Sequence, residues 1–488
     1  MSDASTPLVY TGLLRSTKPL LGPPSMIGKD PIVVVGAGIG GLVAAHTLRR
    51  AGQEVLVLEA GVRSGGRVQT VIDGPWVTES GPHLFSGMPP EALMMLEELG
   101  VARLLPAAGA DRRFLIQDGG LVAVPATTAE MLSTSLLSVA GRLRLLREPF
   151  IPKGNADRES VAAFVRRRMG TEFSQRFIEP VVAAAYAGDP TALLAKYAFA
   201  ESVRYEAGAG SILKGRMRAS RTARREGRRV VPAWTCERGS GALPARLAAA
   251  LGEDLHLNAE VAEVVWSGSA GWQVTQHDGT VHSAAGVVVT VGAAALGRGL
   301  VVGLPHTLAL SDFAAMPVAP TVSLSLGFRR EDIRHPLDGH GVVGPVDGGA
   351  GFRSCVFVSS LFPERAPAGH VLLTVQLGSV SDRDVAMIST EALTTRTLAS
   401  LTGLLGITAQ PCFVARSAGA ALVPQPLDGH DRFLARADAI ETDLPGIVFC
   451  GRWRDGVTEG ALARGGGEAG QRLLMRLGGR EHGIPRSD

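Results

Sequence analysis

The run PIVVVGAGIGGLVAAHTLRRAGQEVLVLEA, residues 31–60, restricts the fold of this chain more than any other segment. Its β-branched stretch Ile32–Val35 is typical of a buried parallel strand, and three glycines in GxGxxG spacing follow it. Apolar residues then recur at helical spacing from Leu42 to Leu48, and a second apolar strand covers Val55–Leu58. This order of strand, glycine turn, helix and strand predicts a βαβ unit of the Rossmann type.

The glycine turn predicts a dinucleotide site. Gly36 makes the tight turn, Gly38 lets the backbone approach a diphosphate, and Gly41 lets the helix pack on the strand. Free amides at the helix N-terminus attract the anion. Glu59 follows Gly41 by 18 residues, close to the distance expected for a carboxylate that binds ribose hydroxyls. The predicted contacts are Gly36, Ala37, Gly38, Ile39, Gly40, Gly41, Glu59 and Ala60.

Two later motifs favour FAD over NAD. The stretches RSGGRVQT (63–70) and ESGPHLF (79–85) resemble the second glycine pair and the Gly-Pro turn of FAD-containing amine oxidases, phytoene desaturases and protoporphyrinogen oxidases. The resemblance implies that the glycine pair passes the FAD diphosphate and that the Gly-Pro turn lies beside the isoalloxazine ring. The residues that it implies as cofactor contacts are Arg63, Gly66, Arg67, Gly81, Pro82, His83 and Leu84.

The C-terminal segment LPGIVFCGRWRDGVTEGALARGGGEAGQRLL (444–474) predicts a strand at Ile447–Cys450, a glycine-rich turn and a helix. In the families that this chain resembles, such a segment closes the flavin site, and the helix N-terminus stabilises negative charge on the reduced ring. The resemblance also implies that the backbone of Val261 contacts adenine and that FAD is bound non-covalently. The remaining implied contacts are Gly451, Arg452, Val457, Thr458 and Glu459.

These segments predict an α/β fold built around a discontinuous Rossmann-type FAD-binding domain. We expect that domain to comprise residues 31–86, 231–296 and 431–480. A mixed-sheet substrate-binding domain is expected over 297–430, and a helical cap over 87–230. Residues 1–30 are expected to form an N-terminal extension.

The motif AYAGDP (185–190) could be ordinary helix punctuation. With LRLLREPFIP (143–152), ESVAAFVRRRMG (159–170) and GSILKGRMR (210–218), it resembles the helical region of bacterial protoporphyrinogen and coproporphyrinogen oxidases, within the flavin amine oxidase superfamily. The resemblance covers nearly all of residues 31–475. It implies porphyrinogen oxidation in porphyrin and heme biosynthesis, with O2 or a quinone as acceptor. Flavin N5 would accept the hydride, and no side chain is assigned a catalytic role.

The identity of the substrate stays open at this point. His340 and Gln376 stand where the family often has an aromatic and an apolar residue, so both are candidate substrate contacts, and a buried polar group needs a partner. Oxidation or desaturation of a smaller, more polar molecule in a specialised pathway is therefore an alternative. A non-catalytic FAD-fold binding protein is another. An amine oxidase is disfavoured, because those enzymes generally place a Lys near flavin N5 and no Lys follows Lys214.

Charge and cysteine content restrict the other partners. The four cysteines are far apart and form no CxxC pair, which predicts no metal site and favours a reducing cytoplasm. No apolar run reaches the ~20 residues that span a bilayer. The arginine-rich stretch 215–230 is expected to be a solvated loop or, with helices around 131–146, a peripheral contact with anionic lipid. Nucleic acid is disfavoured, because no aromatic residue interleaves with these arginines.

Overall fold

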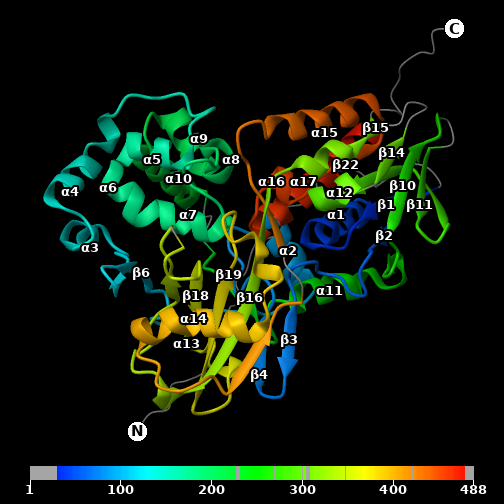
Figure 1. Cartoon of the computed structure of the whole chain (residues 1–488). Helices are drawn as coiled ribbons and strands as arrows, with labels where there is room; N and C mark the ends of the chain where they lie inside the picture. Colours follow the sequence, from blue (N-terminus) through cyan, green and yellow to red (C-terminus); the bar gives the residue numbers. More distant parts are fainter. Residues whose placement is uncertain are drawn as a thin grey trace.

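The computed structural model describes residues 30–226, 231–268, 271–298, 300–303, 308–346, 348–418 and 421–478. The N-terminal extension predicted over residues 1–30 lies, except for Asp30, outside the described residues. Figure 1 shows a group of helices at the upper left, a part around α1 and α17, and a large sheet below them. The part around α1 and α17 contains the glycine turn predicted to bind a dinucleotide, and for that reason we call it the nucleotide-binding part.

The nucleotide-binding part is built on a five-stranded sheet whose strand order is β22-β13-β1-β2-β9. Each neighbouring pair in this sheet is parallel, and β1 lies in the middle with all four residues buried. Its strands are β1 (Ile32–Val35), β2 (Val55–Leu58), β9 (Leu255–His256), β13 (Gly286–Val289) and β22 (Ile447–Phe449). Three distant parts of the chain therefore meet in one sheet.

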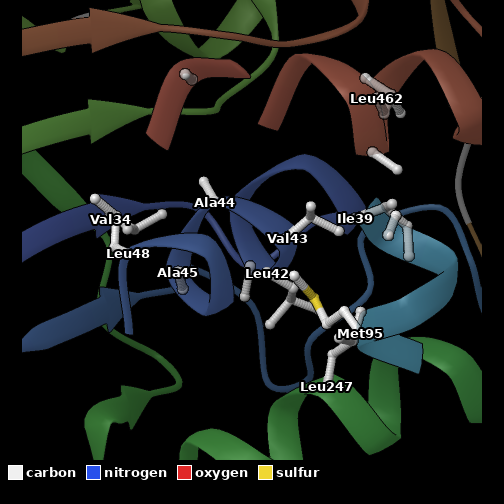
Figure 2. Close-up of a cluster of buried hydrophobic side chains, with 14 of the residues drawn as sticks. Val34, Ile39, Leu42, Val43, Ala44, Ala45, Leu48, Met95, Leu247 and Leu462 are labelled. Carbon is white, nitrogen blue, oxygen red and sulfur yellow. The ribbon is translucent and has the colours of Figure 1, made fainter. Parts of the chain in front are cut away.

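The helix that follows β1 packs against the last helix of the chain. These are α1 (Ile39–Arg50) and α17 (Glu459–Gly478). A Cβ on Gly466 of α17 would lie 2.1 Å from the carbonyl oxygen of Gly40, so only glycine permits this approach. Figure 2 shows the apolar side of α1, where Leu42 contacts a core that also holds Met95 of α2 (Pro90–Glu98) and Leu247 of α11 (Ala242–Leu251).

A second sheet of order β12-β11-β10-β14-β15 covers the side of the nucleotide-binding part. Trp272 is fully buried between the two sheets and donates from its indole nitrogen to the carbonyl of Pro445 at 3.0 Å. The strands are β10 (Val261–Trp266), β11 (Trp272–Gln276), β12 (Val281–Ala284), β14 (Val301–Gly303) and β15 (Leu308–Ala309). Two short ribbons pair β3 (Thr70–Asp73) with β4 (Trp76–Glu79) and β5 (Arg103–Leu104) with β8 (Thr235–Cys236).

The third large element is an eight-stranded sheet of order β20-β16-β19-β18-β17-β6-β7, with β21 also paired to β16. The strands are β6 (Arg113–Gln117), β7 (Gly120–Ala123), β16 (Val318–Arg329), β17 (Gly341–Val343), β18 (Ser354–Phe357), β19 (His370–Leu377), β20 (Phe413–Arg416) and β21 (Ala421–Pro424). One face is apolar and packs on α14 (Thr390–Leu405). The other face carries the polar residues Ser323, Ser325, Thr374 and Gln376, because side chains alternate along a strand.

Two parts of the segment predicted as a helical cap, 87–230, join other elements. Strand β6 pairs in parallel with β17, which adds the β6–β7 hairpin to the eight-stranded sheet. Helix α2 packs into the core beneath α1 (Figure 2). The local sequence could not predict these contacts, because Phe114 and Val342 become neighbours only in the tertiary fold.

The helices at the upper left of Figure 1 form a separate layer. They are α3 (Thr128–Ser133), α4 (Val139–Leu146), α5 (Val161–Met169), α6 (Thr171–Phe173), α7 (Glu179–Tyr186), α8 (Ala195–Ala198), α9 (Ala200–Ala209) and α10 (Ile212–Arg225). The fully buried Arg168 holds them together: its Nε donates to Glu148 at 2.9 Å and its Nη1 lies 3.3 Å from Glu206.

The loop expected over 215–230 is instead helical as far as Arg225, and residues 227–230 lie outside the described part of the chain. Ser211 caps α10 by accepting from the amide of Lys214 at 3.1 Å, and Gly215 lets Tyr205 of α9 pack closely against the helix. The cap, this packing contact and the high helix propensity of arginine and alanine together stabilise α10.

The other helices are α12 (Ala293–Arg298), α13 (Val358–Leu361), α15 (Asp431–Asp443) and α16 (Arg452–Asp455). Within the ranges that the structure describes, no helix combines the length and the apolar character that crossing a bilayer requires.

Candidate functional site

The glycine turn leaves open space beside the N-terminus of α1. A Cβ on Gly41 would lie 2.0 Å from the Gly36 carbonyl oxygen, so this glycine serves helix packing. A Cβ on Gly38 would meet no heavy atom within 4 Å, and one on Gly66 would meet only Gly38, at 3.6 Å. No side chain caps α1 at Gly38. Backbone amides therefore face a space that fits a phosphate group.

The carboxylate of Glu59 fixes the end of this turn. Its Oε2 accepts from the amide of Ala37 at 2.6 Å, and its Oε1 accepts from the amide of Gly61 at 2.8 Å. An ionised carboxylate offers about four acceptor positions, so two remain for sugar hydroxyls. The amide of Ala259 donates to the Glu59 carbonyl at 2.8 Å, which brings the start of β10 at Val261 beside the turn.

The second glycine pair is joined to the first turn. Gly65 pairs with Gly38 in an isolated parallel bridge, and the Gly65 amide donates to the Ala37 carbonyl at 2.8 Å. Arg63 and Ala60 are exposed at the outer edge of this region. A Cβ on Gly81 would lie 2.2 Å from the Arg67 carbonyl oxygen, so the Gly-Pro turn passes directly over the segment that carries Arg67.

The segment 79–85 is held by the buried carboxylate of Glu79. That carboxylate accepts from the Ser240 amide at 2.8 Å and from the Thr70 hydroxyl at 2.7 Å. Burial raises the pKa of Glu79, against the lowering effect of these hydrogen bonds. Beyond the turn, Leu84 packs with Phe362. The segment is thereby fixed between the ribbon β3–β4 and the eight-stranded sheet.

His83 carries a polar atom without a partner. Its side chain is 8% exposed, and its Nε2 is buried with no hydrogen-bond partner among the described residues. Burial, then repulsion from His340 and Arg365, lowers the pKa of His83 to about 3, so the ring is neutral at pH 7. A buried polar atom of this kind normally finds a partner. A ligand bound against the Gly-Pro turn would supply that partner.

Four charged side chains from three chain segments meet near this turn. Arg452 of α16 donates to Glu459 at the start of α17 at 2.6 Å, and also donates to the Val457 carbonyl. Burial, then repulsion from Arg452, lowers the pKa of Arg67 to about 9, with further contributions from Glu459 and Arg353. The structure therefore brings together the predicted contacts from the second glycine pair and from the C-terminal segment.

The rest of the C-terminal turn is internally hydrogen bonded. Gly451 has a φ of 149° and donates to Asp455 Oδ2 at 2.6 Å, while Thr458 Oγ1 accepts from the Ala461 amide at 3.2 Å. Burial raises the pKa of Asp455 to about 6. These bonds fix the approach to α17.

Both predicted substrate residues adjoin the same region. Gln376 Oε1 accepts from the Ser323 hydroxyl at 3.1 Å, and that hydroxyl lies 3.3 Å from the Ser80 carbonyl oxygen. His340 interacts electrostatically with His83. The polar face of the eight-stranded sheet therefore looks onto the segment 79–85. Because Gln376 is already hydrogen bonded within the protein, its polarity alone does not require a polar substrate.

The AYAGDP motif ends α7 next to this sheet. Ala187 adopts a left-handed conformation with a φ of 53°, and Gln425 Nε2 donates to the Tyr186 carbonyl at 2.7 Å. A Cβ on Gly188 would lie 2.0 Å from Gln425 Oε1, so this glycine is also required by packing. A cavity of about 210 Å³ lies at the end of α7 and is lined by Tyr186, Tyr197, His430 and residues 452–457.

Three residues of the site escaped the sequence analysis: Arg353, Arg365 and Gln425. Arg365 is 2% exposed and donates to the Cys236 carbonyl at 2.8 Å, 4.0 Å from Glu79. No local pattern marks an arginine that will be buried, so no signal in the sequence would have found them. In the described part of the chain, no group of His, Cys, Asp or Glu could hold a metal ion.

Comparisons with known proteins were made for the whole chain. A family model described as flavin containing amine oxidoreductase matches residues 39–472. Protoporphyrinogen oxidase 2 of Arabidopsis thaliana is 27% identical over 482 residues, covering 91% of this chain and 94% of the relative. Chloroplastic protoporphyrinogen oxidase of Nicotiana tabacum is 31% identical, covering 89% and 83%. Coproporphyrinogen III oxidase of Bacillus subtilis is 25% identical, covering 88% and 95%.

Solved structures resemble this chain over almost their whole length. A provisionally named protoporphyrinogen oxidase from an Exiguobacterium species has a TM-score of 0.73 at 20% identity, covering 92% of this chain and 99% of that chain. A putrescine oxidase with bound putrescine has a TM-score of 0.64 at 18% identity, with the same coverage. Both likenesses establish the fold.

Proposed function

The chain belongs to the flavin-containing amine oxidoreductase family, and we propose that it oxidises a porphyrinogen to a porphyrin with O2 or a quinone as electron acceptor. Family membership makes it an FAD-dependent oxidoreductase. One observation carries the choice of substrate. Relatives named protoporphyrinogen or coproporphyrinogen oxidase match along 91% and 88% of this chain, so the similarity includes the substrate side of the molecule.

The residues present fit FAD, which we propose is bound non-covalently. The open space at Gly38 and Gly66 would take the diphosphate, and Glu59 would bind the ribose hydroxyls. The backbone near Val261 would contact adenine. The buried, unpartnered ring nitrogen of His83 would face the flavin end of the cofactor. When bound, FAD supplies the two-electron acceptor for the hydride that leaves the substrate.

The chain's own residues would place the substrate and exclude water. Glu79 holds the Gly-Pro turn through Ser240 and Thr70. The polar face of the eight-stranded sheet, with Gln376, would form the opposite wall. Positioning of this kind contributes to the rate because the reacting atoms are held close together before the reaction.

A second candidate is oxidation of a smaller, more polar molecule. Its support is the pair His83 and His340, whose rings are both neutral at pH 7 because burial lowers the pKa of His83 to about 3 and that of His340 to about 4. Such rings could each pair with a polar group of a ligand. Gln376 supports either candidate, since Ser323 donates to its Oε1 while its amide group keeps further donor and acceptor positions.

We also propose a peripheral membrane contact at an apolar surface that we call the α4 patch: Val139, Leu143, Leu146 and Phe150. These side chains are 54% to 82% exposed. The basic helix α10 lies next to the patch, because Lys214 donates to the Pro149 carbonyl at 2.8 Å and lies 5.7 Å from the centre of the Phe150 ring. An exposed apolar patch beside basic residues suits an anionic lipid surface.

The proposed activity is tested by giving purified holoenzyme coproporphyrinogen III and protoporphyrinogen IX under air. Porphyrin fluorescence should rise well above the non-enzymatic rate, and anaerobic addition should bleach the flavin absorbance. A holoenzyme that dithionite reduces normally, yet leaves both porphyrinogens at the non-enzymatic rate, would reject the porphyrinogen assignment and favour the second candidate.

A further inference from the structure

Partly buried arginines gather near Glu459 in the candidate site. Arg452, Glu459 and Arg353 all lie within electrostatic range of Arg67 and influence its pKa. Arg452 forms the ion pair with Glu459, with 2.6 Å between Nη2 and Oε1. Within the described ranges, neither Arg67 nor Arg353 has a carboxylate within 4 Å. Two partly buried guanidinium groups therefore lie in one region without an ion-pair partner of their own, and each has a buried Nε without a hydrogen-bond partner among the described residues, an arrangement that a ligand with negative charge would stabilise.

The backbone of Arg353 is fixed at the edge of the substrate side. Its amide donates to the Gln376 carbonyl at 2.9 Å, and its carbonyl accepts from the Gly344 amide at 2.7 Å. It stands immediately before β18 in the eight-stranded sheet. The backbone of Arg353 is therefore held by β19, which carries Gln376, and by Gly344 at the end of β17. His340 directly precedes β17.

The guanidinium group of Arg353 is only partly used by the protein. Its Nη1 donates to the Ala184 carbonyl in the last turn of α7, two residues before the helix ends. Its Nε is buried and has no hydrogen-bond partner among the described residues. Burial lowers the pKa of Arg353 to about 10, which still leaves it charged at pH 7. A charged donor thus remains free on the Nε side of the fork.

We propose that Arg353 binds a carboxylate of the substrate. This inference rests on the proposed function, since porphyrinogens carry carboxylate side chains. A guanidinium fork matches the geometry of a carboxylate and forms strong charge-assisted hydrogen bonds. With Nη1 held by α7, the fork is oriented before the substrate arrives, so little side-chain entropy is lost on binding.

The phosphates of FAD are the other source of negative charge. They suit Arg67, which directly follows the glycine pair that borders the open space at Gly38. Arg353 instead comes from the eight-stranded sheet and contacts α7, both on the substrate side. Arg67 is therefore assigned to the cofactor and Arg353 to the substrate.

The test compares the variants R353M and R353K with R416M as the matched control. Arg416 of β20 lies in the same sheet and donates to the carbonyls of Ile388 at 2.6 Å and Ala386 at 2.8 Å. It faces the α14 side, because it pairs with the core residue Leu324. R416M thus removes an arginine that, like Arg353, donates to backbone carbonyls but lies outside the site.

We expect R353M to keep its FAD and to raise the KM for coproporphyrinogen III by about 10- to 100-fold, with kcat changed by no more than a few-fold. R353K should recover part of this loss, and R416M should match wild type. Methyl esters of the substrate lack the carboxylates, so wild type and R353M should show the same, high KM with them. The ester measurement on wild type is independent of whether any variant folds.

Each other outcome overturns the assignment. An unchanged KM in R353M, or a KM difference that persists with the methyl ester, shows that Arg353 does not bind a carboxylate. A fall in FAD content with an unchanged KM per bound flavin assigns the anion to the cofactor instead. Wild-type holoenzyme that is inactive with both porphyrinogens rejects the proposed function itself, which is distinguishable because that result appears before any variant is compared.

Discussion

The amide of Ala37 donates to the carboxylate of Glu59 at 2.6 Å, which ties the turn after β1 to the end of β2. One side chain therefore shapes the glycine turn, and its remaining lone pairs would accept hydrogen bonds from the sugar of the proposed cofactor. A change at Glu59 is therefore expected to affect both the shape of the glycine turn and the binding of the sugar.

We expect Glu59→Ala to weaken FAD binding by about 1.5–3 kcal/mol, because charge-assisted hydrogen bonds to the ribose are lost. The dissociation constant follows from quenching of flavin fluorescence on adding back FAD to apoprotein. Glu54→Ala, at an exposed position just before β2, is the control and should bind as wild type does. Equal affinities for the two variants would contradict the role of Glu59.

Substitutions at two glycines of the same turn should have different effects, one on flavin binding and the other on folding. Gly38→Asp places a negative charge in the open space without a clash, so the protein should fold but purify without flavin. Gly41→Ala puts a methyl group 2.0 Å from the Gly36 carbonyl oxygen, so it should impair folding itself. Circular dichroism and the ratio of 450 to 280 nm absorbance, about 0 for a flavin-free protein, separate the effects.

The matched control for Gly38→Asp is Gly403→Asp. Gly403 is an exposed residue of α14 where a Cβ would also meet nothing within 4 Å. That variant should retain FAD. A yellow Gly38→Asp protein with full flavin occupancy would remove the diphosphate from this position.

Asp455 should make stability depend on pH. Burial raises its folded-state pKa from 3.8 to about 6, so the folded protein binds this proton more tightly than the unfolded chain does. Its contribution to the free energy of unfolding is therefore fully present below pH 3.8 and is lost as the pH rises through 6. Asp455→Asn cannot ionise and keeps an acceptor for the Gly451 amide, so it should melt higher than wild type at pH 8.

The advantage of Asp455→Asn should be constant above about pH 7 and should shrink as the pH falls from 6 towards 4. Thermal melts of both proteins between pH 4.5 and 8, about half a unit apart, measure this difference. The same difference in melting temperature at every pH would show that the carboxyl group of Asp455 keeps an ordinary pKa.

Arg168 should be essential to the helical layer. Arg168→Met leaves the buried carboxylate of Glu148 without its main counter-ion, and removing one partner of a buried pair costs about 3–5 kcal/mol. Urea denaturation provides the measurement. Arg112→Met breaks a half-exposed pair with Asp338 and should cost less than about 1 kcal/mol. Similar losses in the two variants would argue against a special role for the buried pair.

The α4 patch predicts binding to anionic vesicles. Wild type should float with vesicles that contain anionic lipid, and added salt should weaken the association, because basic residues of α10 contribute about 1 kcal/mol each. The double change Leu146→Asp and Phe150→Asp should abolish flotation. Met387→Asp, at a residue that is 87% exposed elsewhere, is the control. Flotation that is independent of lipid charge would rule out the proposed contact.

The sequence predicts the nucleotide-binding part well because its signals are local. The strand Ile32–Val35, the three glycines and Val55–Leu58 stand in order along one short stretch, and the structure has β1, α1 and β2 there. The C-terminal strand and helix were also predicted, since Ile447 begins a buried run that ends at a glycine turn.

The substrate side could not be predicted to the same depth. Strands β6 and β7 fall in a stretch expected to be helical, because their partner β17 lies more than 200 residues later in the chain, as the pairing of Phe114 with Val342 shows. Arg353 is one of 44 arginines, and only the tertiary fold brings it into contact with α7. The sequence predicts a loop at α10 because the arginine-rich stretch gives no sign of the packing contact between Gly215 and Tyr205.

The contact of Gly466 with Gly40 has a consequence for biosynthesis. The ribosome makes β1 and α1 first, but β22 and α17, which complete their sheet and cover their surface, emerge about 400 residues later. At roughly 5–20 residues per second, the first βαβ unit waits on the order of 20–80 s for its last neighbours. Its apolar surface must be shielded during that interval. The nascent chain should acquire flavin only at the end of translation, and the C-terminal helix is thus the step that commits the protein to its holo state.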